Sequence, residues 1–193
     1  MTLERKTEPE LNELANRRGF MQAGFLSAAA IALLSGSEAL AAKQGDSATS
    51  AKDVELLNQA LAAEQQAIAA YQVGAGSGLL SPPMKSLALE FQGHHKTHAD
   101  LLASTVSKLG GKAVEAKAKY DFPVAQLKTQ ADVLRFAASL EKGAVAAYVA
   151  AIPKFGDREL SHAAATILGD EAMHWATLRN ALGEPPVPAA FVG

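Results

Sequence analysis

The chain contains no cysteine among its 193 residues. This absence excludes disulfide bonds, thiolate zinc sites and cysteine nucleophiles. An excess of one charge is also lacking, since 18 basic residues stand against 20 acidic ones, so the composition indicates no nucleic-acid partner. Aromatic residues make up only 6% of the chain while alanine is abundant, which favours helices over a β fold. The 49% hydrophobic content excludes a disordered chain.

A long hydrophobic run is missing too. The apolar run over residues 23–34 would span about 18 Å as a helix, short of the ~30 Å hydrocarbon core of a bilayer. It follows the pair Arg17-Arg18, which resembles a twin-arginine export motif, and precedes the cleavage pattern Ala39-Leu40-Ala41. We therefore predict a bacterial signal peptide over residues 1–41, with an uncleaved amphipathic start as the alternative.

This interpretation predicts an exported, periplasmic or otherwise extracytoplasmic protein that uses the twin-arginine export machinery and has no membrane segment after cleavage. Residues 42–52, rich in serine, glycine and lysine, are predicted to be a flexible leader. The helical domain is predicted over residues 53–183, and residues 184–193 form a proline-rich tail.

Two sequence matches at nearly the same offset indicate an internal repeat. The pattern E-x-x-A-[IV]-A-A-Y occurs at residues 64–71 and again 77 residues later, at 141–148. His95-x-x-His98 corresponds to Glu171-x-x-His174, 76 residues later. A duplicated two-helix unit explains both matches.

Apolar and ionisable residues recur at helical spacing in four segments, around residues 57–71, 91–102, 134–148 and 167–178. Glycine and proline separate the first segment from the second and the third from the fourth. About twenty residues without periodicity, 110–129, lie between the second and third segments, as a long crossover would. We predict an all-α four-helix bundle built from two repeated hairpins with one long crossover.

Six ionisable residues occupy positions that periodicity assigns to the core. A buried carboxylate must be neutralised, paired or bound to a metal. Di-metal carboxylate bundles supply a Glu from each of two helices and a Glu-x-x-His from each of the other two, a pattern this chain nearly reproduces. The predicted metal ligands are Glu64, His95, His98, Glu141, Glu171 and His174.

On these motifs the sequence resembles the ferritin-like domain family of exported bacterial proteins. The resemblance spans residues 53–192 and includes the Tyr-Asp-Phe-Pro segment (120–123), the segment 167–174 and the tail 185–191. It implies the four-helix fold shared by ferritins and rubrerythrins and a metal site, rather than a particular reaction.

His95 departs from the family pattern, which has glutamate there. Three carboxylates in place of four leave a two-metal cluster one positive charge richer, and a neutral imidazole cannot bridge two metals as a carboxylate does. We therefore expect an asymmetric pair of metals or a single ion. Iron is the expected metal, with manganese and zinc as alternatives.

Two functions are compatible with these residues. The first is a metal-binding protein with oxidoreductase chemistry, either oxidation of Fe(II) or removal of peroxide. The second is a non-catalytic, stress- or desiccation-associated bundle whose site is structural or vestigial, with the glutamates paired to histidines. A weaker third is an interaction module that uses the proline-rich tail. We expect a monomer or dimer rather than a ferritin shell, because the chain stops about ten residues after the fourth helix.

Residues near the predicted ligands allow simpler interpretations. Tyr71 and Tyr148 are expected to be packing residues, with ligand orientation as the alternative. Asp170 could contact a ligand histidine or lie on a solvated helix face. His94 and His162 are expected to be ordinary core histidines.

Overall fold

The computed structural model describes residues 47–192. Within them the chain forms four long helices and no strand, which confirms the predicted all-α bundle. The helices are α4 (Ser47–Gly76), α5 (Pro82–Lys108), α6 (Gln130–Ala151) and α7 (Arg158–Ala181). Two short 3₁₀ turns, η1 (Val124–Gln126) and η2 (Ile152–Lys154), precede α6 and α7. The predicted signal peptide over 1–41 and residues 42–46 of the predicted leader lie outside the described residues.

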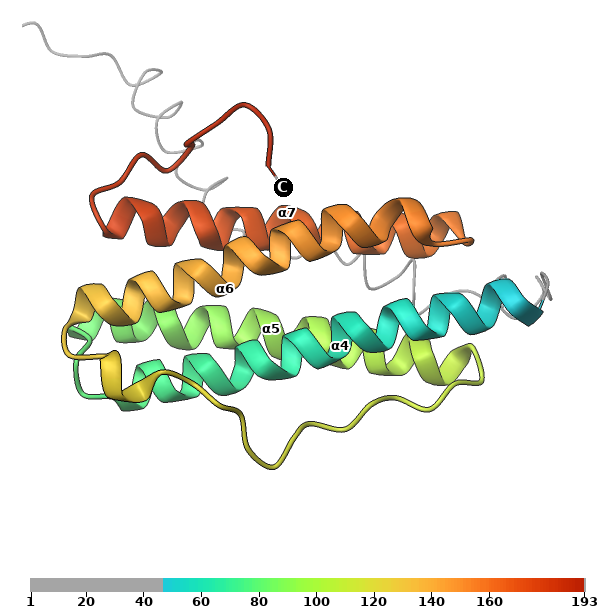
Figure 1. The fold of residues 1–193 in the computed structure, drawn as a ribbon, viewed down its shortest axis with the longest axis horizontal. Coiled ribbons are helices and arrows are strands. Elements are labelled where there is room, and N and C mark those ends of the chain that lie inside the picture. The colour runs from blue at the N-terminus through green and yellow to red at the C-terminus, as the bar shows by residue number, and fades with distance from the viewer. Residues whose placement is uncertain (1–46, 193) are drawn as a thin grey trace, which may run out of the picture.

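The helices are arranged as two hairpins. α4 packs along α5 and α6 packs along α7, and α4 also contacts α6 (Figure 1). The segment between α5 and α6 runs lengthwise beside α4, as a long crossover must if the two hairpins are to lie side by side (Figure 1). No helix in the described part of the chain has the length and apolarity that a membrane crossing needs.

The first helix begins earlier than predicted, because residues 47–52 of the predicted leader are helical. Tertiary contacts account for this. The buried carboxylate of Asp53 accepts hydrogen bonds from the backbone N–H groups of Gly156 (2.8 Å) and Asp157 (3.2 Å), just before α7. Gly156 lies so close to Thr49 that a Cβ there would overlap the Thr49 side chain. This end of α4 is thus attached to the second hairpin.

The other helix boundaries follow local signals. α5 begins at Pro82, where the missing N–H costs nothing, and is followed by Gly110 in a left-handed conformation (φ +78°). Thr129 and Asp132 form a capping box at the start of α6, each side chain accepting a backbone N–H. The predicted breaks between the helices are confirmed.

Side chains of α4 hold the first part of the crossover. The Asn58 amide donates to the carbonyl of Lys112 (3.0 Å) and accepts from the N–H of Val114 (2.8 Å). Gln65, two turns further along α4, donates to the Val114 carbonyl (2.9 Å). These bonds satisfy backbone groups that no regular secondary structure would satisfy.

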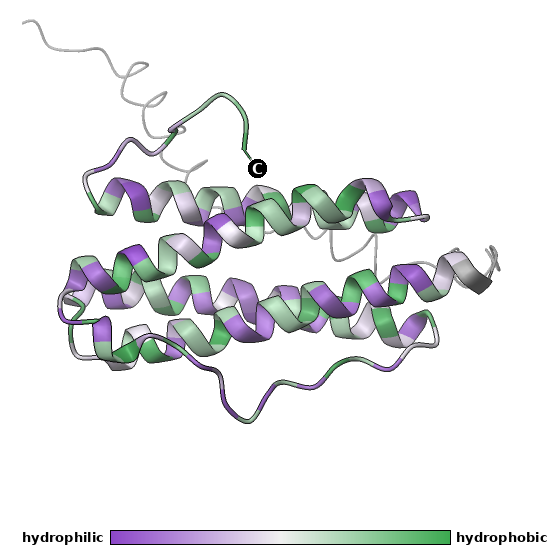
Figure 2. Ribbon diagram, in the orientation of Figure 1, coloured by the Kyte–Doolittle hydropathy of each residue, from purple (hydrophilic) through white to green (hydrophobic). Residues whose placement is uncertain are grey.

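Hydrophobic and hydrophilic residues alternate along all four helices, as expected for amphipathic helices (Figure 2). The buried apolar residues form two groups: one includes Leu61, Val106 and Ile167, and the other includes Tyr71, Phe91 and Leu178. Along α4, Glu64 follows Leu61 of the first group and precedes Tyr71 of the second. The ionisable residues therefore form a polar layer between two apolar layers.

A candidate metal centre between the hairpins

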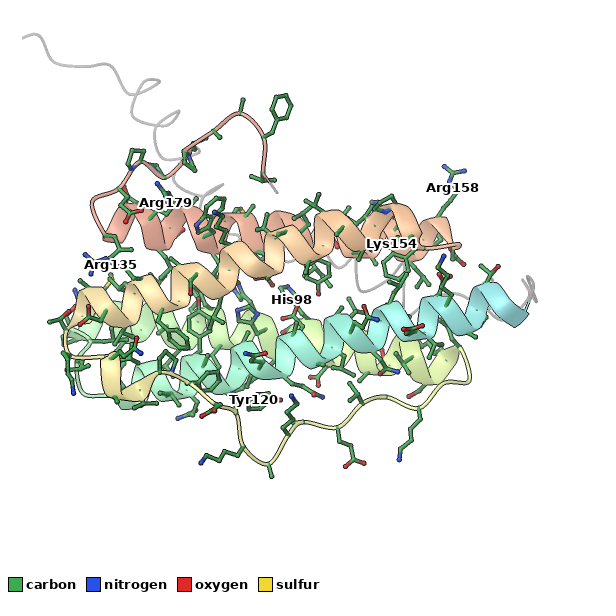
Figure 3. The ribbon with its side chains drawn as sticks, viewed as in Figure 1. His98, Tyr120, Arg135, Lys154, Arg158 and Arg179 are labelled. Carbon is green, nitrogen blue, oxygen red and sulfur yellow. The ribbon has the colours of Figure 1, made fainter. Side chains whose placement is uncertain are left out.

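All six predicted metal ligands are buried and meet in this polar layer. Figure 3 shows His98 in the middle of the bundle, whereas the labelled Arg135 and Arg158 lie at opposite ends. Each helix contributes: α4 carries one ligand candidate, α5 two, α6 one and α7 two. They are Glu64, His95, His98, Glu141, Glu171 and His174.

One half of the cluster is built around His98. Its Nδ1 atom lies 3.1 Å from Oε1 of Glu171 and 3.6 Å from Oε2 of Glu64. His95 completes this half, with Nδ1 at 2.8 Å from the same Glu64 oxygen. One ligand atom from each of these four residues lies within 4.8 Å of the others, close enough to hold one ion.

The other half repeats this arrangement around His174. Its Nδ1 atom lies 3.6 Å from Oε1 of Glu141 and 3.6 Å from Oε2 of Glu171. His95 again takes part, through Nε2 at 3.3 Å from Glu141 Oε1. Glu171 therefore presents one oxygen to each half, as a bridging carboxylate does, and His95 presents one nitrogen to each half.

Several of these atoms are close together without forming hydrogen bonds. His98 Nδ1, His174 Nδ1 and both carboxylate oxygens of Glu171 are buried and have no hydrogen-bond partner. Their separations of 3.1–3.6 Å lack hydrogen-bond geometry, so the atoms converge on common points rather than on one another. Buried polar atoms left unpaired are costly, and a cation at each convergence point would satisfy them. The residues present thus fit a metal site.

Two tyrosines hold the glutamates across the bundle. The hydroxyl of Tyr148 in α6 donates to Oε1 of Glu64 in α4 at 2.7 Å, and the hydroxyl of Tyr71 in α4 donates to Oε1 of Glu141 in α6. The expectation that these tyrosines only pack was wrong, because each reaches the glutamate of the other hairpin rather than that of its own helix. They orient the carboxylates of two candidate metal ligands.

Asp170 lies behind the histidines, on the side away from the glutamates. Its Oδ2 atom is 3.4 Å from Nε2 of His98 and 3.2 Å from Nε2 of His174. A negative charge on this side favours protons on the two Nε2 atoms, which leaves the Nδ1 atoms free to bind a metal. Of the two interpretations of Asp170, the structure supports contact with the histidines that are candidate ligands.

His94 is the residue that the sequence reasoning missed. It is half-buried, not a core histidine, and its Nδ1 lies 3.2 Å from Asp170 Oδ2 and 2.9 Å from His174 Nε2. The repeat contained the signal, because an offset of 76 aligns His94-His95 with Asp170-Glu171. The first hairpin thus has two adjacent histidines where the second has two adjacent acids. His162, by contrast, is exposed on α7.

The carboxylates keep the three buried histidines protonated in the metal-free protein. Burial lowers the pKa of each, but contacts with Glu141 and Glu64 outweigh it and raise the pKa of His95 to about 9. The pKa of His98 rises to about 11, chiefly through Asp170 and Glu171 against burial, and that of His174 to about 11, chiefly through Asp170 and Glu141.

The histidines in turn keep most of the carboxylates ionised. Burial raises the pKa of Glu64, but His95 and His98 outweigh it and bring the pKa to about 2. The pKa values of Glu141 and Asp170 also fall well below their usual range despite burial, because of contacts with histidines. Only Glu171 has a raised pKa, owing to burial and to the charge of Glu64. Positive and negative groups thus offset each other without a metal.

A cavity of about 110 Å³ reaches the cluster between α4 and α6. Glu64, His95 and Tyr148 line its inner part. Its walls are mostly alanines of the two helices: Ala60, Ala63, Ala67, Ala144, Ala147 and Ala151. The small side chains leave room for a few atoms next to the cluster.

The family model described as the ferritin-like domain matches residues 52–184. A comparison with curated proteins gives no match.

Solved structures with the same fold include a conserved hypothetical protein from Mycobacterium tuberculosis, 27% identical, which covers 74% of this chain and 99% of that one with a TM-score of 0.64. The diiron bacterioferritin of Desulfovibrio desulfuricans is 20% identical, with 72% and 82% covered and a TM-score of 0.66. The ferritin-like diiron-carboxylate proteins of Bacillus anthracis are 21% identical, with 69% and 97% covered and a TM-score of 0.61.

Proposed function

The chain belongs to the ferritin-like domain family, and on that premise we propose that its buried Glu/His cluster binds one or two divalent metal ions, iron foremost. The observation that carries this proposal is the set of buried, unpaired ligand atoms on His98, Glu171 and His174. The diiron sites named for two structural neighbours support it. Manganese and zinc remain alternative occupants, since imidazole and carboxylate ligands also suit them.

We further propose that the protein is an oxidoreductase that oxidises Fe(II) or removes peroxide. Bound iron would supply the one-electron chemistry. The chain itself supplies ligand charge through Glu64, Glu141 and Glu171, ligand orientation through Tyr71 and Tyr148, and exclusion of bulk water through the two apolar layers. The alanine-walled cavity has room for a small co-reactant such as dioxygen or hydrogen peroxide beside His95.

The non-catalytic alternative has one specific observation in its favour. His95 pairs with Glu64 at 2.8 Å and with Glu141 at 3.3 Å, so a protonated imidazole can occupy the place of a bridging acid without any metal. A vestigial or purely structural site would use this arrangement.

An anaerobic metal titration tests the proposal. Wild-type protein should bind one or two Fe(II) per chain at micromolar concentration, and the exposed His162→Ala variant should bind the same number. On exposure to oxygen or peroxide the loaded protein should oxidise its iron. Failure to bind iron, manganese or zinc more tightly than millimolar would establish the vestigial alternative, and metal binding without oxidation would leave a structural site.

Export is proposed from Arg17-Arg18 and from the cleavage pattern at residues 39–41. Changing both arginines to lysine in the full chain should leave uncleaved precursor in the cytoplasm, detectable by fractionation and by its greater mass. Normal export of that variant would rule out the twin-arginine route.

A further inference from the structure

Three ligand atoms converge outside the cluster, on the outer side of His174. The distance between His94 Nδ1 and His174 Nε2 is 2.9 Å, and each lies 3.2 Å from Asp170 Oδ2. Nitrogen and oxygen ligands bound at ~2.0–2.1 Å around a tetrahedral ion stand about 3.3 Å apart, and around an octahedral one about 3 Å. The three atoms thus have the spacing of one face of a coordinated cation.

Hydrogen bonding leaves one atom of this group without a partner. His94 Nδ1 and His174 Nε2 face each other at 2.9 Å, so one of the two nitrogens can donate to the other. Asp170 Oδ2 is buried and has no hydrogen-bond partner, although three imidazole nitrogens approach it. An unpaired buried carboxylate oxygen is costly, and an ion bound above the face formed by the three atoms would satisfy it together with both nitrogens.

This group also connects the cluster to solvent. The His94 side chain is 31% exposed, that of Asp170 is 11% exposed and that of His174 only 2%. An ion from solvent therefore meets His94 first, whereas the Glu171 side chain is fully buried.

We propose that His94, Asp170 and His174 form an outer metal site that takes a divalent ion such as Fe(II) or Zn(II) and holds it before it passes to the buried cluster. The loading role rests on the function proposed above; the outer site itself does not. Two imidazoles and one carboxylate favour transition metals over magnesium or calcium, which prefer all-oxygen ligands.

Because both sites use His174, they cannot bind an ion through this residue at the same time. Its Nε2 faces the outer group and its Nδ1 faces Glu141 and Glu171. A neutral imidazole offers a lone pair on only one nitrogen, so one His174 ring binds the outer or the inner ion but not both. An ion held outside must leave before His174 completes the inner site.

Rapid mixing with Co(II) under anaerobic conditions tests this proposal, because the visible absorbance of Co(II) reports its ligands. Wild type should bind in a fast phase followed by a slower one. His94→Ala should lose the fast phase and load the cluster at least about tenfold more slowly, with the same final stoichiometry, because an outer site that is about ten- to a hundredfold weaker holds fewer ions for transfer. His162→Ala, the matched control, should behave as wild type. Glu141→Gln should keep the fast phase and lose the slow one.

The outcomes separate the two proposals. Equal rates and spectra for His94→Ala and wild type would overturn the outer site and leave the buried site standing. A single fast phase that disappears in His94→Ala and persists in Glu141→Gln would support the outer site and overturn the buried one. Absence of any Co(II) binding in wild type would overturn both.

Discussion

Tyr148 in α6 donates a 2.7 Å hydrogen bond to Glu64 in α4, across the boundary between the two hairpins. Tyr71 makes the reciprocal bond from α4 to Glu141 in α6. Each hairpin thus supplies the tyrosine that orients the buried glutamate of the other. The positions of these two carboxylates therefore depend on correct docking of the hairpins.

Removal of one of these hydroxyls should weaken both the fold and the site. Tyr148→Phe leaves Glu64 Oε1 without its donor, and a hydrogen bond to a charged group is worth about 1.5–3 kcal/mol. We expect a loss of that size in the unfolding free energy of the metal-free protein, measured in urea. Metal affinity should fall about ten- to a hundredfold. The control is Tyr120→Phe on the crossover, whose hydroxyl lies far from the glutamates in the sequence and accepts the N–H of Lys117. A Tyr148→Phe variant as stable as the control would contradict a role for this bond.

Restoration of the missing acid should increase metal occupancy. His95→Glu places a carboxylate opposite Glu171, and four carboxylates nearly cancel the charge of two divalent ions. The iron content after anaerobic loading should rise towards two per chain. His95→Gln removes the imidazole without adding charge and serves as the control. The same increase in both variants would show that steric hindrance by the imidazole, rather than missing charge, limits occupancy.

Removal of the Glu141 carboxylate should lower the unfolding free energy and the metal content together. Glu141→Ala deprives Tyr71, His95 and His174 of their common partner, and unpaired buried groups cost about 1–3 kcal/mol. Metal that binds only the folded state adds stability by mass action, so the variant loses this contribution as well. Thermal unfolding with and without Fe(II) measures both effects. Glu90→Ala, at an exposed position of α5, should leave both unchanged.

The stability of the metal-free protein should be greatest between about pH 4.5 and pH 6.5. The raised pKa values of His95, His98 and His174 contribute stability that is fully present below about pH 6.5. This contribution is lost as the pH rises through the pKa of His95, about 9, and those of His98 and His174, about 11. The lowered pKa of Glu64 contributes stability that is complete above ~4.5 and is lost as the pH falls towards about 2. Glu171, with a raised pKa, has the opposite dependence on pH and offsets part of the carboxylate contribution. Urea unfolding in the presence of a chelator measures this profile.

Bound metal should make the unfolding stability rise, rather than fall, above about pH 6.5. Ions must displace the protons held by the cluster histidines, so metal affinity should rise from pH 5 to pH 8. With saturating Zn(II), unfolding stability should increase over the interval in which the metal-free protein loses it. Parallel profiles with and without zinc would show that the histidines are not ligands.

The helical segments and the cluster could be predicted from local patterns. Heptad-like spacing identified the helices because a helix buries one stripe, and the 76- and 77-residue offsets located equivalent positions in both hairpins. Glutamates and histidines on those stripes then had to meet in the core. The start of α4 could not be predicted, because residues 47–52 resemble a linker in composition and are held by Asp53 against the loop before α7.

The sequence by itself determined which residues enter the polar layer, since periodicity decides the buried face of a helix before any neighbour is known. Tertiary structure alone decided their partners. The axial offset and rotation of one helix against another determine that Tyr71 reaches Glu141 rather than Glu64. They also place His94 beside Asp170 and His174, although 76 or more residues separate it from both. Those distances depend on how four helices pack together, a relationship that no single stripe of residues contains.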